Sequence, residues 1–72
     1  MIHIDLDADL NMERDDGRNF TRVPKSAKRP LVGSVLVAGR PGFWSWVVID
    51  EVDDLIVCFH QVSAKHAASI AP

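Results

Sequence analysis

Three apolar runs separated by short, turn-forming junctions constrain the fold of this chain more than any other feature. The runs span residues 31–38, 43–50 and 55–62 and are rich in β-branched and aromatic residues, which favour strands. Gly39-Arg40-Pro41-Gly42 predicts a four-residue hairpin loop, and an acidic turn follows near 51–54. Because such junctions are too short for a parallel crossover, the sequence predicts an antiparallel meander.

The flanking segments predict two further elements and a possible third. A short strand at 19–23 follows the Asp16-Gly17 turn, and Ser63 can cap a helical turn at 64–69. The last residues could add a fifth strand. Four or five bent strands with one helical turn favour a small all-β barrel, because an open sheet of this size would leave exposed edges.

Length and charge set the domain organisation that we expect. The chain has 72 residues, which is enough for one domain. A domain of this size needs nearly all of its apolar side chains for the core, so we expect no deep cleft. Residues 1–16 hold six acidic side chains and one basic one, whereas residues 17–30 hold five basic ones. We therefore expect an acidic N-terminal arm over 1–18, partly flexible, and a single β-barrel domain over 19–72.

The middle apolar run is unusual because both of its faces are apolar. One face carries Trp44, Trp46 and Val48, and the other carries Phe43, Val47 and Ile49. A monomeric barrel would leave one of these faces uncovered. Either the segment 1–30 covers it or another molecule does.

The aromatic residues at the first hairpin predict a protein-binding surface. Exposed aromatic side chains near a hairpin tip bury a large area on binding at little entropic cost. The expected contact residues are Arg40, Phe43, Trp44 and Trp46. The competing interpretation is that at least one tryptophan fills the interior of the barrel.

A basic stretch over residues 18–29 predicts an alternative function in nucleic-acid binding. Cationic side chains can follow a phosphate backbone, and an aromatic ring among them can stack on a base. The candidate residues are Arg18, Phe20, Arg22, Lys25, Lys28 and Arg29. A solvated linker explains the same stretch equally well, and the net charge of −2 offers no global attraction for polyanions.

Acidic residues alternate with apolar ones at the N-terminus. Asp5, Asp7, Asp9, Asn11 and Glu13 resemble the start of a calcium loop, but the glycine and the glutamate that such a loop needs are replaced by Leu10 and Asp16. The better interpretation is an extended arm whose apolar face is formed by residues 4, 6, 8 and 10. Its acidic face could lie against the basic stretch and mask it.

The remaining reactive residues predict neither a metal site nor catalysis. Cys58, His60, His66 and His3 match no strong zinc spacing, and no third group completes a nucleophilic site around Cys58. A single cysteine excludes an internal disulfide and favours a reducing compartment. We expect a cytoplasmic protein that is not an enzyme, with no metal, no cofactor and no membrane segment.

Several segments carry a resemblance to known proteins. Ile4 to Asn11, Asp15-Asp16-Gly17, Asn19-Phe20-Thr21 and Val32 to Gly39 resemble small proteins of high-GC actinobacteria and their phages. This resemblance implies a cytoplasmic setting and no particular activity. The meander with its helical turn is similar to SH3-like barrels, which bind peptides, proteins and nucleic acids. We therefore expect a binding module, most simply one that contacts a protein or self-associates.

Overall fold

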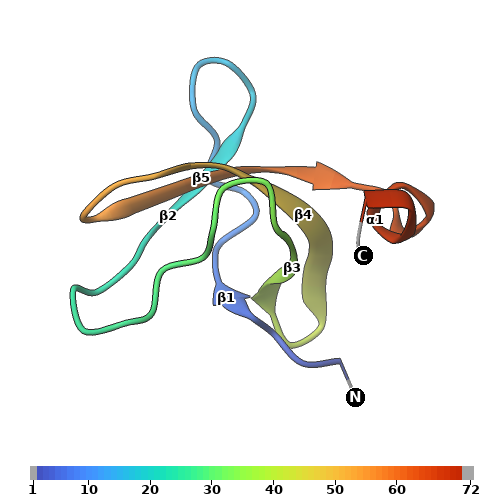
Figure 1. Cartoon of the computed structure of the whole chain (residues 1–72), viewed down its shortest axis with the longest axis horizontal. Helices are drawn as coiled ribbons and strands as arrows, with labels where there is room; N and C mark the ends of the chain where they lie inside the picture. Colours follow the sequence, from blue (N-terminus) through green and yellow to red (C-terminus); the bar gives the residue numbers. More distant parts are fainter. Residues whose placement is uncertain (1, 71–72) are drawn as a thin grey trace.

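The computed structural model describes residues 2–70, which form one curled five-stranded sheet and a short helix (Figure 1). The strand order in the sheet is β1-β3-β4-β5-β2. The elements are β1 (Leu6–Asp7), β2 (Asn19–Arg22), β3 (Val35–Arg40), β4 (Phe43–Val52), β5 (Ile56–Val62) and α1 (Ala64–Ile70). The chain is therefore mainly β, as the sequence predicts, and its sheet has the shape of a half-barrel.

The predicted antiparallel meander is confirmed. β3 pairs with β4, β4 pairs with β5, and β2 pairs with the free edge of β5, all antiparallel. The helical turn is confirmed as well: the backbone N–H of His66 donates to Oγ of Ser63 at 3.0 Å, so Ser63 caps α1. Figure 1 places α1 and the β4–β5 turn at opposite ends of β5.

The first strand of the meander begins later in the chain than the sequence predicts. Leu31 and Val32 are 79% and 64% exposed and lie in a turn, where Ser34 N–H donates to the carbonyl of Leu31. Gly33 has φ +86°, a conformation that interrupts an extended strand. The strand consequently begins at Val35.

The hairpin loop is shorter than predicted, because β3 continues two residues beyond its predicted end. Gly39 and Arg40 belong to β3, and Arg40 pairs with Phe43, so that only Pro41 and Gly42 form the turn. At its other end β4 continues to Val52 through a register shift between Ile49 and Glu51. This bulge carries the strand into the predicted acidic turn.

The fifth strand comes from the N-terminal segment of the chain and lies at one edge of the sheet. β1 runs parallel to β3, with Asp5 N–H donating to the carbonyl of Val37 at 2.9 Å and Ala8 N–H to that of Gly39 at 3.2 Å. The fifth strand suggested for the last residues is not found up to Ile70, where the chain is helical, and residues 71–72 lie outside the described part.

The core lies on the inner face of the curled sheet. Its largest fully buried side chains are Phe59, Ile49, Val47 and Val57. Residues 6, 8 and 10 pack in the same cluster, which confirms three of the four positions predicted for the apolar face of the N-terminal segment, whereas Ile4 is half-buried outside the cluster. Residues assigned above to an acidic arm thus share one core with the meander.

Neither tryptophan belongs to this core, so the interpretation in which a tryptophan fills the barrel is wrong. The aliphatic side chains of β4 and β5, together with Phe59, already fill the space. No helix within residues 2–70 has the length and apolar character needed to cross a membrane.

Candidate functional site

A tight turn fixes the tip of the β3–β4 hairpin. Gly42 has φ +84° and follows Pro41, the combination that a type II turn requires. Gly39 pairs with Trp44 across the hairpin at φ +133°. A Cβ atom at Gly39 would lie 2.6 Å from Cα of Trp44 and would overlap the carbonyl oxygen of Phe43. The two strands therefore approach more closely than any other residue at position 39 would allow.

This hairpin carries all four residues predicted to contact a partner, but on two faces: Arg40 and Phe43 share one face, and Trp44 and Trp46 share the other. Phe43 is 52% exposed and Trp44 is 38% exposed, whereas Trp46 is half-buried. The rings of Trp44 and Trp46 meet edge to face, with centroids 6.3 Å apart. Arg40 pairs with Phe43 in the sheet, and its Nε lies 3.4 Å from Oδ1 of Asp7. We call Arg40, Phe43, Trp44 and Trp46 the hairpin surface.

A small apolar cavity adjoins the hairpin surface on the side of α1. Its volume is about 190 Å³, and its lining residues are Val35, Trp46, Ala64, Ala67 and Ala68. The alanine side chains of α1 are too short to fill the space beside the Trp46 ring. The Ser63 cap sets the start of the helix and hence the position of these alanines.

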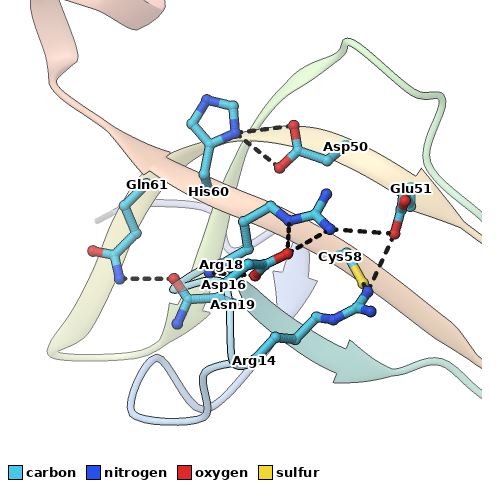
Figure 2. A network of polar contacts seen from close by, with 9 residues as sticks. All are labelled: Arg14, Asp16, Arg18, Asn19, Asp50, Glu51, Cys58, His60 and Gln61. Atoms are coloured by element: carbon cyan, nitrogen blue, oxygen red, sulfur yellow. Dashed lines mark hydrogen bonds and ion pairs between the residues drawn. The ribbon is translucent and has the colours of Figure 1, made fainter.

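The outer face of the sheet, which carries Trp44, Trp46 and Val48, continues across β5 to a polar network (Figure 2). His60 pairs with Val48, and its Nδ1 lies 2.9 Å from Oδ2 of Asp50. A carboxylate at that distance favours the proton on Nδ1. Asp50 is the extra residue of the register shift between Ile49 and Glu51, and its carboxylate contacts His60 on the outer face.

Arg14 covers the buried thiol of Cys58 at the far end of this face. Arg14 Nη1 donates to Sγ of Cys58 at 2.9 Å and to Oε2 of Glu51 at 3.2 Å. The hydrogen bond to Cys58, with the nearby Glu51 carboxylate, raises the pKa of Arg14 above its ordinary value. Figure 2 shows the guanidinium between sulfur and carboxylate. Sequence reasoning missed this contact because Arg14 and Cys58 lie on elements far apart in the chain.

The basic stretch does not form one continuous cationic surface. Arg18 Nη2 lies 2.8 Å from Oδ2 of Asp16 and 3.6 Å from Oε2 of Glu51. Its hydrogen bonds hold the pKa of Asp16 below the ordinary value, so the carboxylate stays charged beside it. Phe20 lines an open hollow with Arg14 and Ile56.

The Arg29 guanidinium is held by hydrogen bonds to backbone carbonyl oxygens. It donates to the carbonyl oxygens of Pro24, Ala27, Asp53 and Asp54. Arg22 and Lys28 line a hollow of about 500 Å³ that also contains three carboxylates, those of Asp5, Asp7 and Asp9. The acidic and basic segments therefore do lie near one another, as the masking hypothesis requires. The ion pair that Asp7 forms, however, is with Arg40, outside the stretch.

The candidate metal ligands are separated by these contacts. Cys58 and His60 share the outer face, as the strand alternation predicts. Sγ of Cys58, however, accepts a hydrogen bond from Arg14, and Nδ1 of His60 contacts the Asp50 carboxylate. Among residues 2–70 no three His, Cys, Asp or Glu side chains gather in a way that could hold a metal ion.

Comparisons with protein-family models, curated proteins and solved structures find no match to this chain.

Proposed function

We propose that the chain is a non-enzymatic binding module that contacts another protein through the hairpin surface. The observation that carries this proposal is the exposure of Phe43 and Trp44 at a tip whose backbone is fixed by Gly39 and the Pro41-Gly42 turn. Aromatic side chains held in place before binding lose little conformational entropy when a partner covers them.

The nucleic-acid alternative has weaker support. Arg18 is neutralised by two carboxylates, and the Arg29 guanidinium is used by backbone carbonyls. Phosphate binding needs cations that can replace counterions along a backbone. Of the basic stretch this leaves Arg22, Lys25 and Lys28, two of which share a hollow with three acidic residues.

We also propose that the half-barrel is a variant of the SH3-like fold and that the protein is cytoplasmic. The antiparallel meander and the short helix after β5 support the first proposal. The single cysteine in a small domain without an internal disulfide supports the second.

Affinity capture from a lysate of the native host tests the proposed function. The bait is the tagged full chain, and it is compared with a Phe43→Ser, Trp44→Ser double variant. We expect specific proteins to be retained by the wild type and lost by the double variant, because the apolar contact area at the tip is removed. Quantitative mass spectrometry measures the loss.

The matched control is a Leu31→Ser, Val32→Ser double variant, which removes two exposed apolar side chains from another turn. It should retain the same proteins. Equal capture by all three baits would contradict the proposal. So would oligonucleotide binding that weakens steeply with salt and shifts amide signals at residues 18–29, because that result would favour the nucleic-acid alternative.

A further inference from the structure

The loop that precedes β2 is anchored firmly at its base. Asn19 is 3% exposed, and its Nδ2 donates to the carbonyl oxygens of Leu10 and Met12 at 2.9 and 3.0 Å. Nε2 of Gln61 donates to Oδ1 of Asn19 at 3.1 Å, which joins the base to β5. Leu10 packs in the core. The buried residues Leu10 and Asn19 therefore fix the two ends of the loop.

Residues 13–18 at the tip of this loop, which we call the strap, are attached differently. Residues 13–17 are all exposed, and Figure 1 shows the loop projecting from the sheet beside β2. The strap closes on itself, because Arg14 N–H donates to the carbonyl of Arg18 at 2.7 Å and Gly17 N–H to that of Arg14 at 2.9 Å. It is thus a compact turn that can move as a unit about its fixed base.

The polar contacts between the strap and the sheet converge on one carboxylate. Oε2 of Glu51 lies 3.2 Å from Nη1 of Arg14 and 3.6 Å from Nη2 of Arg18. The Glu51 side chain is 59% exposed, and ion pairs in contact with solvent stabilise a structure weakly and are screened by salt. Arg14 also donates to Sγ of Cys58 at 2.9 Å. Because sulfur is a weak acceptor, Glu51 is the main attachment of the strap.

The strap covers the part of the outer face where Cys58 lies. Cys58 is 3% exposed although it lies outside the core cluster, and it pairs with Phe20 of β2 and Glu51 of β4. The Arg14 guanidinium lies between its sulfur and the Glu51 carboxylate (Figure 2). A hollow of about 460 Å³ adjoins this contact, and Phe20 and Ile56 are part of its lining. Release of Arg14 would therefore open both the thiol and the hollow to solvent.

We propose that the strap is a salt-sensitive gate, whose closed position depends on the Glu51 carboxylate and whose opening exposes Cys58 while the rest of the fold stays intact. Salt screens Glu51 and releases the two arginines of the strap, whereas the buried hydrogen bonds of Asn19 at the base persist. A cationic group of another molecule that pairs with Glu51 opens the gate in the same way. The strap is separate from the hairpin surface, so the gate does not rest on the proposed function.

The rate at which iodoacetamide alkylates Cys58 in the full chain, followed by mass spectrometry, measures the opening. The reagent is uncharged, and the chain has a single cysteine. We expect moderate salt to raise the wild-type rate by about fivefold, because two exposed ion pairs are weakened. Glu51→Gln should raise the rate at low salt by about the same factor and remove most of its salt dependence. Asp15→Asn, which removes another exposed carboxylate from the strap, is the charge control and should behave as the wild type does.

Ile49→Val separates opening of the strap from unfolding of the whole chain. Ile49 is 1% exposed, so its truncation weakens the core and speeds alkylation only if Cys58 reacts through global unfolding. We expect the rate of this variant to equal that of the wild type. A rate that rises with Ile49→Val would overturn the proposal. So would a Glu51→Gln rate equal to that of the wild type, or a salt dependence that Glu51→Gln leaves intact.

Discussion

Gly39 shows how one residue determines the shape of the candidate surface. It faces Trp44 across the hairpin, and the space that a side chain would need is occupied by the backbone of residues 43 and 44. Its φ of +133° is also one that other residues rarely adopt. The exposed position of the aromatic rings therefore depends on a residue that has no side chain.

Gly39→Ala should lower the free energy of unfolding by about 3 kcal/mol, because backbone overlap adds to conformational strain. The control is Gly42→Ala, where φ is also positive but a Cβ would meet nothing within 4 Å, and it should cost only about 1 kcal/mol. Urea unfolding measures both values. Equal losses for the two variants would show that steric overlap at Gly39 is unimportant.

Other contacts at this scale could not be inferred from the sequence. Asn19 is buried, with Nδ2 donating to the carbonyls of Leu10 and Met12, and its Oδ1 accepts from Gln61. An asparagine after a turn indicates only a strand start. Its partners lie on segments that only the folded chain brings together, so no local sequence pattern predicts them. The same is true of the hydrogen bond from Arg14 to Cys58.

At the scale of elements, the β4–β5 turn depends on an ionised side chain. Two backbone N–H groups, those of Leu55 and Ile56, bond to the Asp53 carboxylate and hold its pKa below the ordinary value. A lowered pKa in the folded state stabilises the fold at every pH above the ordinary value. This contribution is lost as the pH falls from there through the lowered pKa.

The stability advantage of the wild type over Asp53→Ala should therefore be full near pH 6 and smaller near pH 3. Urea midpoints at the two pH values measure it. Asp54→Ala serves as the control, because the Asp54 carboxylate accepts no hydrogen bond from residues 2–70, and its difference from the wild type should change less. An Asp53→Ala difference that is the same at both pH values would contradict this role of the carboxylate.

The elements were predictable where the signal was local. Apolar runs and turn residues predict the three meander strands, and Ser63 predicts the start of the helix. The predicted bounds are wrong at Leu31, because the positive φ of Gly33 delays the start of β3 to Val35, and at Asp50, because a bulge lengthens β4 to Val52. β1 was recognised only as an apolar face, because its parallel partner β3 lies about thirty residues away in the chain. The cavity was missed for a similar reason, since α1 must first be placed against Trp46.

In the molecule as a whole, the apolar side chains fall into two groups: those that fill the core and those that lie outside it. The core is complete with Phe59 and aliphatic residues of β4, β5 and the N-terminal segment. The largest side chains in the sequence, Trp44 and Trp46, lie outside it on the opposite face of β4. A small domain that leaves its tryptophans outside the core has apolar area available for another molecule.

We infer from their exposure that Phe43 and Trp44 at the hairpin tip serve contact and not folding. The free energy of unfolding of the Phe43→Ser, Trp44→Ser double variant, measured in urea, tests this inference, with Ile49→Val as a core control costing about 1 kcal/mol. We expect the double variant to lose no more than about 2 kcal/mol and to keep the wild-type m-value. A loss of about 3 kcal/mol or more for the double variant, which is the cost of truncating even one buried ring, would contradict this expectation.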